Sequence, residues 1–189
     1  MAKRNVQKRA GTQGRRWPWP AALVVVLLVA AGVGYFAYRA AAKLPGTAMP
    51  SQGNRHIQTA SDPHEPYNSD PPTSGPHMPG IAPWGDYDKP IPKEYQVHNL
   101  EDGGVVIQYH CPKGCPDLVK KLERVFFKYK TPTEKEKKYL HLILAPYPDM
   151  DARLALTAWT RLDTFNDFDE ARIDRFIEAY IGIDHHSKK

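Results

Sequence analysis

The stretch GGVVIQYHCPKGCPDLVKKLERVFFKY, residues 103–129, decides the fold class of this 189-residue chain. Its first seven residues are apolar and rich in β-branched side chains, which is typical of a buried strand. Pro116 suits the first turn of a helix, because its missing N–H is not needed there and its φ is already helical. Apolar side chains then recur at helical spacing, namely Leu118, Val119, Leu122, Val125, Phe126 and Tyr129. The stretch therefore predicts a strand followed by a helix.

The residues that follow continue this succession of elements. YLHLILA (139–145) and RLALTAW (153–159) predict two further buried strands. Asp167 followed by Glu170 is typical of a capping box, and Gly182 suits the end of the helix that it begins. The buried face of this helix would consist of Ile173, Phe176, Ile177, Tyr180 and Ile181. The order predicts an α+β domain, with a small sheet of about three or more strands covered by two helices.

An uncharged stretch at residues 17–38 predicts an N-terminal transmembrane helix. At about 1.5 Å per residue it would span roughly 33 Å, and a bilayer core is about 30 Å thick. Residues 1–16 carry six basic side chains, so the positive-inside rule places them in the cytoplasm and the later residues outside the cytoplasmic membrane. The alternative is a cleaved signal peptide with a small-residue site at 40–42, although signal cores are shorter, at about 7–15 apolar residues.

Proline content divides the remainder of the chain. Residues 40–92 contain 11 of the 18 prolines, which disfavours regular secondary structure. Residues 39–60 predict a linker. The loop at 61–96 is also rich in aromatic residues, so we expect it to be ordered and to belong to an exported domain over 61–184. A polar tail follows at 185–189.

The net charge of +5 is an average over two unlike parts. The first 61 residues hold nine Lys and Arg and no acid, whereas the remainder holds 17 Lys and Arg against 21 Asp and Glu. The exported part is therefore mildly acidic, which excludes a basic nucleic-acid-binding domain and suits a cation better. The partner that these charges predict is membrane lipid, contacted through the N-terminal helix.

Several segments together resemble one known bacterial family. They are PPTSGPH (71–77), VHNLE (97–101), GGVVIQY (103–109), CPKGCP (111–116) and LTAW (156–159). The chain resembles the family called domain of unknown function 3105 over roughly residues 60–181. The resemblance implies an N-terminal membrane segment and an exported domain in a bacterial envelope, and it implies no established activity. The family pattern often has His where this chain has Asp102.

One constellation of residues predicts a metal site. His77 lies in a proline-rich segment that restricts the backbone and could position a ligand, and Met78 adjoins it. His98, Glu101 and Asp102 lie three and four residues apart and would converge on a helix. Imidazole with thioether suits copper, whereas imidazole with carboxylate suits zinc, iron or manganese. We expect these five residues to bind a transition metal such as copper; the alternative is that the histidines only hydrogen-bond the backbone, since no tight zinc motif is present.

The two cysteines form a second constellation. Cys111 and Cys115 lie between the predicted strand and helix, and the intervening Pro112 and Gly114 would permit a turn that joins the sulfurs. In an exported domain a structural disulfide is the expectation. A redox pair at a helix N-terminus and a soft-metal site remain open, because such positions stabilise thiolates and His110 is adjacent.

These observations leave three functions open. The first is a metal-binding exported domain, which does not require catalysis. The second is a thiol-disulfide oxidoreductase that uses Cys111 and Cys115. The third is a non-catalytic module that contacts an envelope protein through the aromatic loop. A hydrolase based on Ser74 and His77 is disfavoured, because no G-x-S-x-G elbow occurs.

The other histidines carry weaker signals. His56, His64 and His110 belong, with His77, His98 and His141, to a set of six histidines between residues 56 and 141 that are possible metal ligands. His141 lies in a predicted strand and is expected in the core, while His185 and His186 lie in the polar tail and are expected to have no function.

Overall fold

The computed structural model describes residues 19–41, 44–130 and 134–186, which fall into two compact units. The unit before Leu44 contains helix α1 (Trp19–Ala41). Within the described residues, no helix reaches the length and hydropathy of a membrane span. The predicted basic segment 1–16 and the first two residues of the predicted span lie outside the described residues, so the span stays a prediction.

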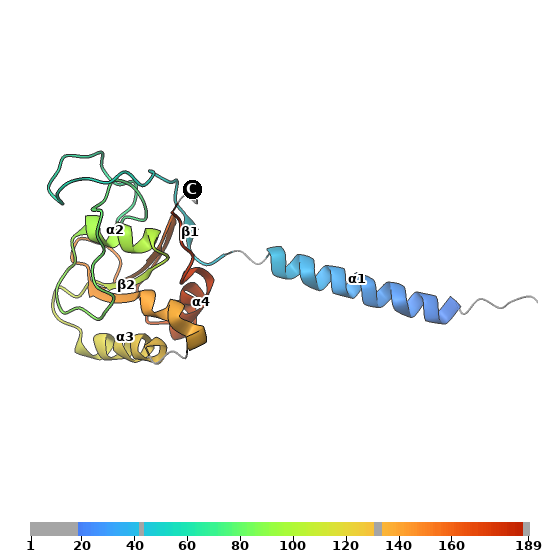
Figure 1. The fold of residues 1–189 in the computed structure, drawn as a ribbon. Coiled ribbons are helices and arrows are strands. Elements are labelled where there is room, and N and C mark those ends of the chain that lie inside the picture. The colour runs from blue at the N-terminus through green and yellow to red at the C-terminus, as the bar shows by residue number, and fades with distance from the viewer. Residues whose placement is uncertain (1–18, 42–43, 131–133, 187–189) are drawn as a thin grey trace, which may run out of the picture. The chain divides into compact units, whose positions relative to one another are not determined.

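The second unit, Leu44–Lys189, is built around a five-stranded sheet (Figure 1). Its strand order is β1-β5-β4-β2-β3, in which β2 pairs with β3 in parallel and every other pair is antiparallel. The strands are β1 (Thr47–Ala48), β2 (Val105–Tyr109), β3 (Leu142–Pro146), β4 (Leu154–Ala158) and β5 (Arg161–Phe165). A parallel pair requires a crossover, which helix α3 (Pro116–Tyr129) supplies together with the 3-10 helix η1 (Glu134–His141).

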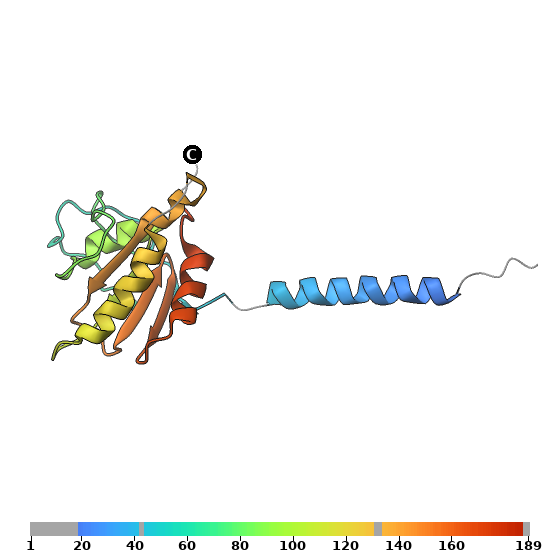
Figure 2. The ribbon, with the colours of Figure 1, turned by 90° about the horizontal axis from the view of Figure 1, so that it is seen from below.

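One face of the sheet is covered by α3 and by α4 (Glu170–Tyr180), as Figure 2 shows. Val105 and Ile107 of β2 point to this face because side chains alternate along a strand. They pack with the buried stripes of both helices, whose members include Leu122, Phe126 and Phe176. The predicted α+β fold, with two helices over the sheet, is confirmed.

The opposite face carries α2 (Lys93–Glu101) and the proline-rich loop (Figure 1). Val106, which alternates with Val105 and Ile107, points to this face and packs with Ile143 and Leu100. The cluster is smaller than that of the first face and is edged by Trp84, Tyr87, Tyr95 and Trp159. Burial of the apolar loop residues here explains why the loop is ordered.

Three details differ from the sequence predictions. Helix α4 begins after Asp169, whose carboxylate accepts a hydrogen bond from Arg172 N at 2.9 Å, so Asp169 and not Asp167 is the cap. Strands β1 and β5 and helix α2 are additional elements. Part of the predicted linker at 39–60 belongs to the compact unit. Strand β1 pairs with β5, and residues after β1 form main-chain hydrogen bonds with the proline-rich loop, such as Ile57 N to His77 O.

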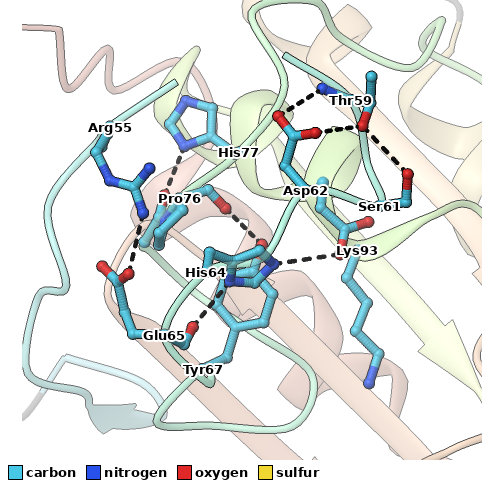
Figure 3. Close-up of polar contacts among 12 residues, drawn as sticks. Arg55, Thr59, Ser61, Asp62, His64, Glu65, Tyr67, Pro76, His77 and Lys93 are labelled. Carbon is cyan, nitrogen blue, oxygen red and sulfur yellow. Dashed lines mark hydrogen bonds and ion pairs between the residues drawn. The ribbon is translucent and has the colours of Figure 1, made fainter. Parts of the chain in front are cut away.

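The loop before α2 is fixed by its own polar contacts (Figure 3). Arg55 pairs with Glu65 at 3.0 Å, and the Tyr67 hydroxyl donates to the carbonyl of Pro76 at 2.5 Å. Residues 71–77, the PPTSGPH motif, are all buried. The structure therefore places the motif inside the domain, where His77 Nε2 and Thr73 Oγ1 are buried without a hydrogen-bond partner among the described residues.

Candidate metal centre

Three segments bring four potential ligands together beside α2. His56 and His77 belong to two extended segments joined by a parallel bridge, in which His77 N donates to Arg55 O at 3.0 Å. His98 and Glu101 lie three residues apart on α2, so their side chains leave the helix on one side. One ligand atom from each of the four residues lies within 4.8 Å of the others. The cluster of His56, His77, His98 and Glu101, hereafter the inner cluster, could therefore hold a metal ion.

The three imidazoles of the inner cluster face one another closely. The ring centroids of His56 and His77 lie 5.0 Å apart, and those of His77 and His98 lie 5.1 Å apart. His56 and His98 stack at 5.4 Å. His77 is edge-to-face with both partners, and one nitrogen of each ring lies within 4.8 Å of the others.

The hydrogen bonds of the rings fix which nitrogen is free. His77 Nδ1 lies 2.7 Å from Gly75 O, and His98 Nδ1 lies 2.8 Å from Met78 O. A carbonyl oxygen only accepts, so each Nδ1 carries the hydrogen and each neutral ring leaves Nε2 with a free lone pair. Metal-binding histidines are commonly oriented by this kind of Nδ1 hydrogen bond.

Glu101 completes the inner cluster from the helix. Its Oε1 accepts a hydrogen bond from Asn54 Nδ2 at 2.6 Å. Its Oε2 lies 3.0 Å from His77 Nε2, and both side chains are fully buried. Neither atom has a hydrogen-bond partner among the described residues. Two lone pairs that face each other in a buried site repel unless a proton or a cation lies between them.

Electrostatics favour the neutral form of His77. Burial is the main cause that lowers the pKa of His77 below its ordinary value, and the neighbouring His98 and His56 lower it further. The hydrogen bond to Gly75 and the charge of Glu101 act in the opposite direction. A ring with a lowered pKa stays unprotonated at neutral pH, which is the form that binds metals.

The local sequence explains how His77 is positioned. Gly75 has φ of 121°, a conformation that side chains rarely adopt, and a Cβ there would lie 3.1 Å from the Tyr67 ring. Gly75 N donates to Gly53 O at 2.9 Å, and Ser74 Oγ accepts from Gln52 N at 3.0 Å. The motif is thus a buried turn that directs His77 toward α2.

The predicted ligands are partly brought together. His77, His98 and Glu101 meet in the inner cluster. Asp102, the C-cap of α2, lies 3.7 Å from His98 Nε2 and belongs to a second group with His98 and His186. Met78 offers its carbonyl oxygen to His98, and a role for its thioether stays a prediction.

The five predicted ligands do not include His56 or His186. His56 is one of six histidines that the sequence offers as possible ligands, but it lies in the predicted linker, and its bridge to His77 brings it into the inner cluster. His186, predicted to have no function, has its ring nitrogens 3.6 Å from Glu101 Oε2 and from Asp102 Oδ1.

The remaining histidines have structural contacts. His141 ends η1 rather than lying in a strand; its Nδ1 lies 3.0 Å from Asp102 O, and its ring stacks on Trp84 at 4.7 Å. His110 Nδ1 lies 2.6 Å from Met150 O. Neither residue belongs to a group of possible ligands among the described residues.

Cys111 and Cys115 form a disulfide, as predicted, with their Cα atoms 5.7 Å apart. The bridge lies between β2 and the start of α3 and packs against the core beneath α3 and α4. Because both sulfurs are bonded to each other, neither is a thiolate ligand in this state.

The family predicted from the motifs is confirmed by comparison with known proteins. Residues 58–188 match the family described as protein of unknown function DUF3105. No curated protein and no solved structure gives a significant match.

Proposed function

The chain belongs to the DUF3105 family, and from that premise and the geometry of the inner cluster we propose that it binds a divalent transition-metal ion. The observation that carries the proposal is the pair of buried, unpartnered atoms His77 Nε2 and Glu101 Oε2, 3.0 Å apart. A bound cation attracts both lone pairs, whereas the free pair is repulsive. His56 and His98 complete a donor set of three nitrogens and one oxygen.

The buried carboxylate supports the same proposal. Burying an ionised carboxylate costs several kcal/mol unless it is paired or coordinates a metal. The groups paired with Glu101 are the imidazoles of His77 and His186, which carry charge only when protonated. The lowered pKa of His77 opposes that protonation, so a metal ion supplies the missing positive charge.

The donor set favours a borderline ion. Imidazole suits zinc, copper, iron and nickel, and the carboxylate adds a hard oxygen. Such a site binds Cu(II) most tightly in the Irving–Williams order and Zn(II) less tightly, so we propose copper as the ion, with zinc as its competitor. When bound, the ion supplies charge neutralisation in the buried site; the chain's own residues orient the ligands and exclude water from His77 and Glu101.

Membrane anchoring belongs to the proposal as well. Its support is the uncharged stretch at 17–38 after six basic residues, which suits a bacterial membrane protein with its N-terminus inside. The Cys111–Cys115 disulfide is compatible with an oxidising compartment outside the cytoplasm. In this arrangement membrane lipid is the partner of the N-terminal helix.

Metal titration of the full-length chain tests the proposal. Calorimetry with Cu²⁺ and separately with Zn²⁺ is expected to give one ion per chain, and His77→Ala and Glu101→Gln are expected to weaken binding by at least roughly tenfold. His110→Ala is the matched control, because His110 bonds a backbone carbonyl outside the inner cluster. Binding by the wild type that is no tighter than binding by His77→Ala would overturn the proposal.

A thiol-disulfide oxidoreductase is the second candidate. The observation in its favour is the parallel β2–α3–β3 unit, whose helix begins directly after the Cys111–Cys115 pair, a position that stabilises thiolates. The reduction potential of the Cys111–Cys115 pair distinguishes a role in thiol exchange from a structural role. A value above about −250 mV would support exchange with other thiols, whereas one below about −300 mV marks a structural bridge.

A further inference from the structure

A second group of possible ligands adjoins the inner cluster and shares a residue with it. His98, Asp102 and His186, hereafter the outer cluster, each offer a ligand atom, and these atoms lie within 4.8 Å of one another. Asp102 Oδ1 is 3.7 Å from His98 Nε2, and the His186 ring lies beside it, with its non-ligand nitrogen Nδ1 at 3.6 Å. His186 Nε2 is also 3.6 Å from Glu101 Oε2. The two clusters are therefore continuous through His98 and Glu101.

Main-chain contacts hold His186 in this position. Gly182 N donates to Gly103 O at 2.7 Å, and His185 N donates to Glu101 O at 2.9 Å. Gly103 has φ of 78°, and a Cβ there would lie 2.8 Å from the main chain that follows Gly182. The turn after α2 thus needs glycine so that the chain segment before His186 can dock on it.

On the α2 side, exposure increases from the buried ligands to the outer cluster, whereas His56, the fourth member of the inner cluster, is itself exposed. The side chains of His77 and Glu101 are fully buried, and that of His98 is 10% exposed. The side chains of Asp102 and His186 are 30% and 43% exposed. An ion that arrives from solvent on this side therefore meets the outer cluster before it reaches His77 and Glu101.

Because the two clusters share His98, they can hold only one ion at a time. His98 Nδ1 carries a hydrogen that it donates to Met78 O, so only Nε2 can bind a metal. That nitrogen cannot be a ligand of two separate ions. The two clusters are therefore alternative positions for a single ion, not a pair of independently filled sites.

We propose that the outer cluster is the entry site through which the ion of the proposed inner site is captured and released. This inference rests on the proposed function. The ion first binds His98, Asp102 and His186. It then keeps His98 while Glu101, His77 and His56 replace the two outer ligands.

Glu101 is placed to carry the exchange. Its free Oε2 lies 3.0 Å from His77 Nε2 and 3.6 Å from His186 Nε2, so one oxygen faces both positions of the ion. Asp184 accepts from His186 Nδ1 at 2.8 Å, which leaves Nε2 of His186 as the free nitrogen. Transfer in either direction follows the same ligands, so entry and release share one path.

Stopped-flow mixing of the full-length chain with Cu²⁺ tests this path. Trp159 is an internal reporter, since its ring lies 6.3 Å from that of His77 and Cu²⁺ quenches indole fluorescence. In His186→Ala and Asp102→Asn, the association rate and the release rate to a chelator are expected to fall together by about tenfold or more. The equilibrium dissociation constant stays unchanged, because both rates change by the same factor.

His185→Ala is the matched control, since His185 docks through its main-chain N–H and belongs to neither cluster. Unchanged rates in this control, with slowed rates in the two outer variants, support the entry site. Unchanged rates in His186→Ala overturn it, and so does weaker binding with an unchanged association rate, which makes His186 a ligand of the resting site. Equal slowing in the control also overturns it. Absence of any tight Cu²⁺ binding by the wild type instead overturns the proposed function.

Discussion

The two faces of the sheet bury different kinds of residue. Beneath α3 and α4 lies a large cluster that is mostly aliphatic and aromatic, with Leu122, Phe126 and Phe176 fully buried or nearly so. Beneath α2 and the proline-rich loop the apolar cluster is small. Polar groups are buried on the α2 side, including Glu101 and His77 with no exposed surface.

This difference separates stability from function. Burial of apolar area is the dominant favourable term in folding, so the α3/α4 face contributes most of the free energy of folding. Buried polar atoms without partners cost free energy, so the polar residues of the α2 face lower the free energy of unfolding. The expectation is that substitutions on the first face change unfolding and those on the second change binding.

Phe176→Ala is expected to have the largest effect on stability. Phe176 is fully buried and packs edge-to-face on Tyr180 at 4.8 Å. Its loss removes buried area and leaves a cavity, which typically costs about 3–5 kcal/mol of unfolding free energy. Urea denaturation measures this loss, and the Cu²⁺ affinity of the folded variant should equal that of the wild type. A weakened affinity would mean that the two faces are energetically coupled.

Glu101→Gln is expected to raise the stability of the metal-free protein, whereas Phe176→Ala lowers it. A Gln amide can donate to the free His77 Nε2 and keep the acceptor for Asn54, so the metal-free variant should be more stable by roughly 1–3 kcal/mol. Metal at about 100 times its dissociation constant should stabilise the wild type by about 2.7 kcal/mol and the variant far less. Denaturation with and without Cu²⁺ measures both effects. A metal-free variant less stable than the wild type would contradict the argument.

The same contrast explains what could be predicted from sequence. The α3/α4 face was predictable because apolar residues recur at strand and helix periods, as in Leu118, Leu122 and Phe126. Helix α2 carries the buried polar groups His98 and Glu101, so apolar periodicity does not mark it as a helix. Strand β5 has intermediate and exposed positions and was missed for a related reason.

The site was predictable where a local sequence pattern marks its residues. His98 and Glu101 lie at a spacing that places them on one side of a helix, and His77 lies in a proline-rich segment that restricts its backbone. His56 reaches His77 through a bridge between distant segments, and His186 reaches Glu101 through docking on Gly103. Such contacts depend on the tertiary fold and leave no periodic signal.

Removal of the Cys111–Cys115 disulfide is expected to have the next largest effect on the unfolding free energy. It again tests the α3/α4 face. The bridge closes a loop of only five residues, for which loop-closure entropy gives about 2 kcal/mol. Cys111→Ser with Cys115→Ser should lower the unfolding free energy by about that amount. The bridge packs against the α3/α4 core, so Cu²⁺ affinity should not change. A loss of Cu²⁺ binding in this double variant would make the sulfurs part of the metal site.

The smallest expected effect is a pH dependence confined to the α2 face. Burial lowers the pKa of His77 below its ordinary value of 6.5, and burial also lowers that of His185. At these two residues the unfolded chain binds protons at a higher pH than the folded chain, so their contribution to the unfolding free energy falls as pH drops below about 6.5. The hydrogen bond to Asp184 raises the pKa of the more exposed His186, which acts in the opposite sense. Urea denaturation between about pH 7.5 and pH 5.5, with a chelator present, measures the slope.

Substitutions on the two faces should change the pH dependence of the unfolding free energy in different ways. His77→Gln removes one of the two histidines whose pKa is lowered and should flatten the slope, whereas Phe176→Ala should lower the whole curve and leave its slope intact. The sign follows from linkage, since a histidine with a depressed pKa destabilises the fold only where the unfolded chain is protonated and the folded chain is not. An unchanged slope in His77→Gln would show that His77 is as readily protonated in the fold as in the unfolded chain. The free lone pair facing Glu101 would then be occupied by a proton, and the repulsion that a metal ion relieves would be absent.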